Sequence, residues 1–436
     1  MKKNILLILF ILLIFTFFTN SCNLRKRKNY NVVLIVIDTL RADHLPFYGY
    51  KGGYEKNTAP FLNNLSKKSV IFKHAFAASS WTAPATASIF TSLYPFQHGV
   101  QMGLLAIKFA QRVDPNITIN KIPEKIKTIT EVLKQNGYKT FGISDNLNIG
   151  ELEGFTQGFD KFETYGYNQA SFITKRLMEW KREIKKNGKY FLFIQFMDPH
   201  APYYGKKPWY KHSEVFKEDI ISRYDSEIRF VDSYIKKLYK EFGWGENTLL
   251  IITADHGEGL WDHGHMDHGK SLYMEEIHVP LVFHYPEIKK KKIIYPVVST
   301  IDILPTVREI LGIGESKEEM GKSLLPLIEN RKNRLNERYL YSHLWKNIRT
   351  VVEFRATIHK KWHFIMDSRK NRFLYDMSND KKEKYNIYGA HSKLAEKLNK
   401  KFTEFYINSK KYTKQKVHIK LTKEKLKKLK SLGYVQ

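Results

Sequence analysis

The chain contains four apolar runs in which hydrophobic and polar residues do not alternate. They cover residues 31–38, 140–143, 190–197 and 248–253. Such a run predicts a strand that is buried on both faces, as the strands of a parallel sheet are. Helical spacing of apolar residues appears between the runs, for example at 126–136 and 224–242. Alternating strands and helices predict an α/β fold, with a mostly parallel sheet flanked by helices.

The pattern changes after about residue 327. Shorter strand-like segments follow at 338–342, 349–354, 357–358 and 363–366, and a Lys-rich helical region begins near Lys393. We therefore expect two structural units, a large α/β domain at residues 31–327 and a small C-terminal α+β subdomain at residues 328–436.

The N-terminus has the composition of an export signal. Lys2 and Lys3 precede an apolar run that ends at residue 18, which is short for a spanning helix of about 20 residues. Cys22, the single cysteine of the chain, follows this run as in a bacterial lipoprotein signal. We expect residues 1–22 to be a signal peptide and residues 23–30 a linker. The protein would then be extracytoplasmic and anchored to the membrane by a lipid on Cys22.

An uncleaved anchor or an ordinary signal peptide is the alternative, because Thr19 stands where a lipoprotein signal usually has Leu. In either case no internal disulfide is expected, since the chain has only one cysteine.

The composition is that of a globular protein with a strong excess of basic residues. The 436 residues are 42% hydrophobic and 27% charged, and the formal net charge is +29. A basic surface favours anionic partners, but the lysines are spread along the whole chain, which also fits a general bias towards Lys. No nucleic-acid-binding motif is visible, so we expect no nucleic-acid partner, which leaves an anionic membrane or a phosphorylated or sulfated substrate.

Acidic and His side chains follow three of the predicted strands. Asp38 ends the first, Asp198 and His200 follow the third, and Asp255 and His256 follow the fourth. Ligands of open α/β sheets bind at the carboxyl ends of the strands. Asp38 alone could be a turn or cap residue, but together these side chains form a plausible metal-binding set.

Thr82 lies in a segment with the signals of a helix start. Ser79 and Ser80 precede it and Pro84 follows, and Ser, Thr and Pro are favoured at this end of a helix. Free amides and the helix dipole attract anions there. Thr82 could therefore contact an anionic substrate, or it could merely cap the helix.

These segments belong to a longer series of motifs that resembles the sulfatase family of the alkaline phosphatase superfamily. The motifs occur in the family's order between residues 31 and 387: Asp38-Thr39, Thr82-Ala83-Pro84, Tyr94-Pro95, His98-Gly99, Asp198-Pro199-His200, Asp255-His256-Gly257-Glu258, His268-Gly269-Lys270, Asp302, Gly321 and Leu374-Tyr375-Asp376. The resemblance implies an alkaline-phosphatase-like fold, with residues 31–327 as the catalytic domain.

Four departures from the family pattern concern the chemistry. Sulfatases convert a Cys or Ser to formylglycine, whose hydrate attacks sulfur, and Thr82 stands at that position. Thr86 replaces the signature Arg, and Thr39 replaces a second early Asp. The sulfate-binding Lys and His after the second strand are absent, and residues 144–146 read Ser-Asp-Asn instead.

The remaining set resembles the site of phosphoethanolamine transferases and lipoteichoic-acid synthases, which use a Thr nucleophile on one divalent metal. The implied metal ligands are Asp38, Thr82, Asp255 and His256. Those enzymes usually have Glu at the first position, and this chain lacks their multi-helix membrane domain. An imidazole among oxygen ligands favours Zn²⁺ or Mn²⁺ over Ca²⁺.

His200, His268 and Lys270 are the other catalytic candidates. The two histidines would bind non-bridging oxygens or protonate the leaving oxygen, and Lys270 would add positive charge. A second metal remains an alternative, with Asp198, His200 and His268 as its ligands. His263 and His265 could substitute for His268, or they could be solvent-facing loop residues.

Three functions fit these residues. The first is hydrolysis or transfer of a phosphate ester through a phospho-Thr82 intermediate. The second is a sulfatase that works without formylglycine. The third is a non-catalytic binding protein that retains the fold, which the complete metal set disfavours.

Overall fold

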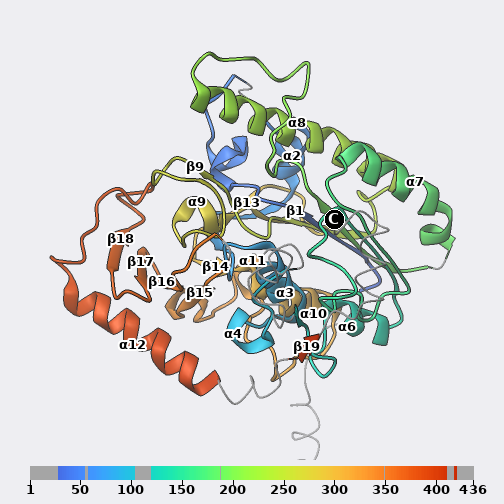
Figure 1. Cartoon of the computed structure of the whole chain (residues 1–436). Helices are drawn as coiled ribbons and strands as arrows, with labels where there is room; N and C mark the ends of the chain where they lie inside the picture. The colour runs from blue at the N-terminus through green and yellow to red at the C-terminus, as the bar shows by residue number, and fades with distance from the viewer. Residues whose placement is uncertain are drawn as a thin grey trace, which may run out of the picture.

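In the computed structural model, an eight-stranded sheet forms the centre of the molecule (Figure 1). The structure describes residues 28–54, 57–103, 119–186, 188–347, 349–409 and 417–419. The strands lie in the order β13 (Lys292–Ile294), β2 (Val70–Phe72), β12 (Leu281–His284), β8 (Thr248–Thr253), β1 (Asn31–Ile37), β7 (Tyr190–Phe196), β5 (Lys139–Ser144) and β6 (Lys161–Thr164). The run from β8 to β6 is parallel, and β12 is antiparallel to both of its neighbours.

The four apolar runs of the sequence are four adjacent parallel strands of this sheet, β8, β1, β7 and β5. Every residue of β7 and β8 is buried, and in β1 only Asn31 is partly exposed. Burial on both faces explains why these strands carry no polar alternation. The predicted α/β fold, with a mostly parallel sheet, is confirmed.

Helices cover the sheet on both sides (Figure 1). Those with the longest spans are α2 (Pro60–Leu65), α3 (Thr82–Thr91), α6 (Ile129–Gln135), α7 (Ala170–Lys186), α8 (Phe216–Phe242) and α10 (Ile303–Leu311). α2, α7 and α8 pack together on one side, and α3 packs with α6 and α10 on the other. Helix α8 begins at Phe216 rather than at Tyr224 as predicted. The exposed residues 216–218 and the buried polar residues Asp219 and Ser222 in its first turns hide the apolar periodicity there.

A second, antiparallel sheet follows near the C-terminus, as expected for an α+β subdomain. It comprises β15 (Leu340–Leu344), β16 (Phe354–His359), β17 (Trp362–Asp367) and β18 (Arg372–Asp376), and α12 (Ser392–Ser409) packs on it. The prediction of a strand at 349–354 is wrong, because β16 begins only at Phe354 and residues 349–353 belong to the connection between β15 and β16. Val351 is 79% exposed, so its apolar character does not reflect a buried strand.

The remaining elements are short. They are α4 (Pro95–His98), α9 (Met274–Ile277), α11 (Leu325–Ile328), β3 (Ala75–Phe76), β4 (Ile119–Lys121), β9 (Gly259–Leu260), β10 (Met266–Asp267), β11 (His278–Val279), β14 (Val298–Ser299), β19 (Val417–Ile419) and five 3-10 turns. The predicted signal peptide with Cys22 lies outside the described residues, and the domain boundary at 327 stays a prediction. Within the described ranges, no helix is long and apolar enough to cross a membrane.

Candidate active site

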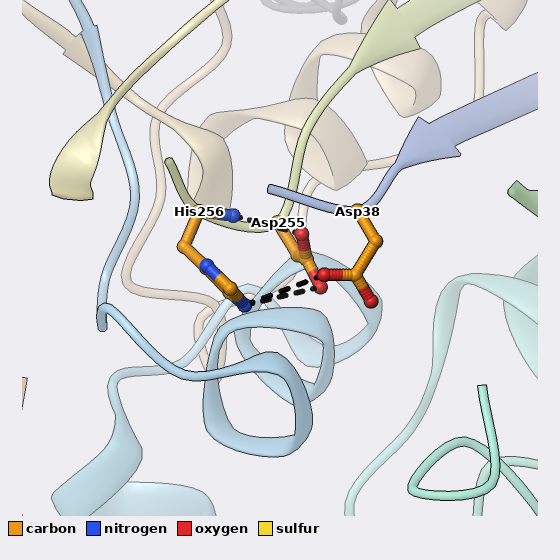
Figure 2. A group of neighbouring side chains, drawn as sticks. All are labelled: Asp38, Asp255 and His256. Atoms are coloured by element: carbon orange, nitrogen blue, oxygen red, sulfur yellow. Dashed lines mark hydrogen bonds and ion pairs between the residues drawn. The ribbon is translucent and has the colours of Figure 1, made fainter. Parts of the chain in front are cut away.

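Three metal-type side chains meet at the carboxyl ends of two adjacent parallel strands (Figure 2). Asp38 follows β1, and Asp255 and His256 follow β8. All three side chains are fully buried, and one ligand atom from each lies within 4.8 Å of the others. The parallel register of β1 and β8 brings these strand ends together.

The orientation of His256 is set by its own backbone. Nδ1 lies 2.8 Å from the carbonyl oxygen of Gly257, so Nδ1 carries the proton and Nε2 presents a lone pair. Nε2 lies 3.6 Å from Oδ1 of Asp38 and 3.8 Å from Oδ2 of Asp255. Figure 2 shows the ring pointing at both carboxylates. This is the geometry of a metal-binding imidazole with its second nitrogen anchored.

Helix α3 delivers Thr82 to the same point. Trp81 is the N-cap residue of α3, and no side-chain hydrogen bond caps this helix. The Thr82 hydroxyl is instead 3.1 Å from Nε2 of His256. Thr82 therefore does not cap α3, as the alternative prediction had it. It lies at the N-terminus of the helix, and its hydroxyl group contacts the ring of His256.

Two buried carboxylates without a cation beside them are electrostatically unfavourable, and this applies to Asp38 and Asp255. Burial raises the pKa of Asp38 to about 6. Burial and the nearby Asp38 raise the pKa of Asp255 well above its ordinary value, and burial lowers that of His256. Oδ1 of Asp38 has no hydrogen-bond partner among the described residues. A divalent cation fits this set, because it would satisfy that oxygen and compensate both buried carboxylates.

Side chains from β5 and β7 support Asp38. Asn146 donates a hydrogen bond of 2.6 Å to Oδ2 of Asp38, and Gln195 lies at 3.4 Å from the same oxygen. Sequence reasoning identified residue 146 only as a departure from the family pattern, and it missed Gln195. Gln195 lies inside the apolar strand β7. A single amide side chain in an otherwise apolar strand is the feature of the sequence that could have identified it.

His200 and His268 lie beside this cluster. The ring of His268 is 4.4 Å from that of His256 and 4.9 Å from that of His200, centroid to centroid. Nδ1 of His268 is 3.2 Å from Oε1 of Glu258. His200 lines a cleft of about 570 Å³ next to the cluster. Lys270 does not join them, because its ammonium group donates to the carbonyl oxygen of Met266.

In the alternative ligand set for a second metal, the rings of His200 and His268 lie 4.9 Å apart, but Asp198 is bonded to other groups. Asp198 accepts a hydrogen bond from the amide of Ala170, and its other oxygen is 3.4 Å from the ammonium group of Lys206. In the described residues, the second group with metal-binding spacing is Glu258, Asp267 and His268. The guanidinium group of Arg349 contacts both Asp267 and His268, so a positive charge already lies there.

His263 and His265 do not substitute for His268, and they are not free loop residues either. Nδ1 of His263 is 2.6 Å from Oε1 of Glu275, and Nε2 of His265 is 2.9 Å from Oε1 of Glu276. These pairs fasten the loop between β9 and β10 to α9.

Comparison with known proteins identifies the family. The family model described as Sulfatase matches residues 30–313, and the model described as N-sulphoglucosamine sulphohydrolase, C-terminal, matches residues 261–408. The fold and the strand-end site define an alkaline-phosphatase-like hydrolase. The chain belongs to the sulfatase family.

Individual relatives share the architecture at low sequence identity. The Delta 4,5-hexuronate-2-O-sulfatase of Bacteroides thetaiotaomicron is 24% identical, with 82% of this chain and 84% of that protein covered. A 2-O GAG sulfatase structure superposes with a TM-score of 0.73 at 20% identity, covering 88% of this chain and 93% of the other. The phosphonate monoester hydrolase of Agrobacterium radiobacter gives a TM-score of 0.70 at 17% identity, covering 87% and 96%.

Proposed function

We propose that this protein hydrolyses phosphate esters with Thr82 as the nucleophile. The observation that carries the proposal is the position of the Thr82 hydroxyl, 3.1 Å from His256 at the N-terminus of α3 and beside two buried carboxylates. A hydroxyl group in this place is oriented towards the point where an anionic ester would bind.

Four residues would hold a divalent metal: Asp38, Thr82, Asp255 and His256. A cation bound there lowers the pKa of a coordinated hydroxyl group and neutralises charge on the transferred group. We favour Zn²⁺ or Mn²⁺ over Ca²⁺, because an imidazole nitrogen is part of the set.

In the first step, Oγ1 of Thr82 forms a bond to phosphorus while the bond from phosphorus to the ester oxygen breaks. The hydroxyl proton passes to water in the cleft, and His200 gives a proton to the leaving oxygen. Nδ1 of His200 is bonded to the carbonyl oxygen of Ala201 at 2.5 Å, which leaves Nε2 for this transfer. In the second step, water attacks phosphorus and gives a proton to His200, while the bond from phosphorus to Oγ1 of Thr82 breaks. Oγ1 then takes a proton from water in the cleft, and the phosphate leaves.

Sulfate ester hydrolysis is the second candidate, and the relatives favour it. Two of the compared proteins carry the name sulfatase, whereas one is named a phosphonate monoester hydrolase. The phosphate ester remains our first choice, since Thr82 cannot be converted to the formylglycine of the family.

Turnover of three p-nitrophenyl substrates by the purified full-length chain tests the proposal. The phosphate monoester, the bis-phosphate diester and the sulfate are compared with Zn²⁺ or Mn²⁺ added. We expect phosphoester turnover that falls by at least about 10³-fold in Thr82→Ala and is partly retained in Thr82→Ser. Sulfate turnover alone would reject the phosphate assignment. Turnover that survives Thr82→Ala would reject Thr82 as nucleophile, and no turnover of any ester would favour a binding protein.

We also propose that a lipid on Cys22 holds the protein at the outer face of a membrane. The support is the apolar N-terminal run that ends just before the single cysteine. Fractionation of cells that carry wild-type protein or Cys22→Ala tests this. We expect the wild type in the membrane fraction and the variant in the soluble fraction. Identical distribution of the two would contradict lipidation.

A further inference from the structure

Two family positions that would supply positive charge to an anionic substrate carry none in this chain, and the ammonium group of Lys270 is bonded to the backbone of Met266. Thr86 stands where the family has Arg, and its hydroxyl is buried without a hydrogen-bond partner in the described residues. Residues 144–146 read Ser-Asp-Asn where the family has a Lys and a His. Because Asp38 and Asp255 lie close by, an ester anion needs a cationic side chain from elsewhere.

Arg349 supplies such a charge from the connection between β15 and β16. Its guanidinium carbon lies 5.2 Å from the ring centroid of Trp81, the residue next to Thr82. Nη1 donates to Nε2 of His268 at 3.0 Å and also to the carboxylate of Asp267. These contacts fix the guanidinium group next to the candidate nucleophile.

The other side of this guanidinium group is available to a ligand. The side-chain hydrogen bonds of Arg349 to the described part of the chain all involve Nη1, so Nε and Nη2 have no partner there. The side chain is 26% exposed and lines the same cleft as His200. Two N–H donors in one plane match two oxygens of a tetrahedral anion.

We propose that Arg349 binds the anionic oxygens of the substrate and replaces the charge that positions 86 and 144–146 lack. This inference rests on the proposed function, since it assumes that the ester enters this cleft. It also gives the C-terminal part of the chain a role in substrate binding. Specificity for a tetrahedral anion would then depend on the loop between β15 and β16, which lies outside the family's N-terminal motifs.

Arg223 provides a matched control in the same cleft. Its Nε donates to Asp219 at 2.6 Å and its Nη2 to Tyr210 at 3.1 Å, so its donors are directed at protein partners. We expect Arg223→Gln to leave anion binding within about twofold of wild type, because this arginine does not contact the residues around Thr82.

Calorimetric binding of inorganic phosphate to the full-length chain, at a fixed Mn²⁺ concentration, tests the inference without turnover. We expect Arg349→Gln to weaken phosphate binding by about 10–100-fold, as for the loss of charge-assisted hydrogen bonds. Arg349→Lys should fall between wild type and Arg349→Gln, because it keeps the charge but not the planar fork. If Arg349→Gln does not fold, the Arg349→Lys result decides.

Three outcomes would overturn the inference. The first is phosphate affinity of Arg349→Gln within about twofold of wild type, and the second is no phosphate binding by the wild type at millimolar concentration. The third is that Arg349→Gln has no further effect on phosphate binding in a His268→Gln background, because Arg349 would then act only through His268. A chain that binds phosphate through Arg349 but hydrolyses no ester would support the inference and reject the proposed function.

Discussion

Nε2 of His256 lies 3.1 Å from Oγ1 of Thr82, although the two residues are 174 positions apart in the sequence. Nδ1 of His256 is committed to the carbonyl oxygen of Gly257, so the Thr82 hydroxyl donates to the lone pair that a cation would also use. Among the described residues, the ion-pair contacts of the two buried carboxylates beside it are with His256. This arrangement supports the proposal that the site holds a metal together with the Thr82 hydroxyl group.

Metal binding should stabilise the fold through this group. At a free Mn²⁺ concentration of 100 times Kd, we expect the free energy of unfolding in urea to rise by about 2.7 kcal/mol. Asp38→Asn should lose most of this gain, whereas Glu246→Gln, an exposed carboxylate after α8, should keep it. Equal stabilisation of Asp38→Asn and wild type would place the metal elsewhere. Stronger stabilisation by Ca²⁺ than by Zn²⁺ or Mn²⁺ would contradict the proposed metal identity.

Asn146 should tune the metal affinity without contacting the metal. Its amide holds Oδ2 of Asp38 at 2.6 Å and so directs Oδ1 towards His256. We expect Asn146→Ala to weaken Mn²⁺ binding by about 10–100-fold, as for other residues that orient metal ligands. Metal titration followed by calorimetry measures this. Asn136→Ala, which removes a side-chain amide at the end of α6, is the control and should leave the Mn²⁺ affinity unchanged. An unaltered affinity of Asn146→Ala would show that Asp38 is oriented by other contacts.

The strand-end residues of the site could be predicted because they follow the strongest signal in the sequence. Asp38, Asp255 and His256 each come directly after a continuous apolar run, and parallel neighbouring strands end at one edge of the sheet. Thr82 could be placed at a helix start for a similar reason, since Ser, Thr and Pro have positional preferences there.

The residues that tertiary packing brings to the site could not be predicted in the same way. Arg349 was assigned to a strand, whereas it lies in a loop that folds over Trp81. Lys270 carries a family motif, yet its ammonium group is bonded to the backbone of Met266. The contact of Arg349 with Trp81 has no local pattern that specifies it, because it depends on how the second sheet packs on the first. The contact of Lys270 is local, but the family motif does not reveal that its ammonium group turns back to the main chain.

Gly269 should be required for the packing of Trp81 beside the nucleophile. It has a φ of +67°, and a Cβ atom there would lie 2.4 Å from Cε3 of Trp81. We expect Gly269→Ala to lower the free energy of unfolding by about 2–4 kcal/mol, from backbone strain and overpacking together. Gly264 has a φ of +78° but no atom within 4 Å of an added Cβ. Gly264→Ala should therefore lower the free energy of unfolding only by the backbone strain, about 1–2 kcal/mol. Equal losses in urea unfolding would show that the contact with Trp81 relaxes without cost.

His263 should make the stability of the protein depend on pH above neutrality. Burial alone would lower its pKa, but the hydrogen bond and charge of Glu275 and the carbonyl oxygen of Glu383 raise the pKa to about 9. Nε2 of His263 is 3.0 Å from that carbonyl oxygen, and the ring stacks on Tyr273 at 3.7 Å. The protonated ring thus joins the β9–β10 loop to the C-terminal part of the chain.

The sign of the effect follows from the raised pKa. The contribution of His263 is fully present below its unfolded pKa of about 6.5 and is lost as the pH rises through 9. We expect a loss of about 1–2 kcal/mol between these values, less than the full linkage energy because solvent screens part of the interaction. Urea unfolding of wild type and His263→Gln from pH 6 to 9.5 measures it, and the difference between the two should shrink with rising pH. A constant difference would mean that His263 contributes through packing on Tyr273 and not through its charge.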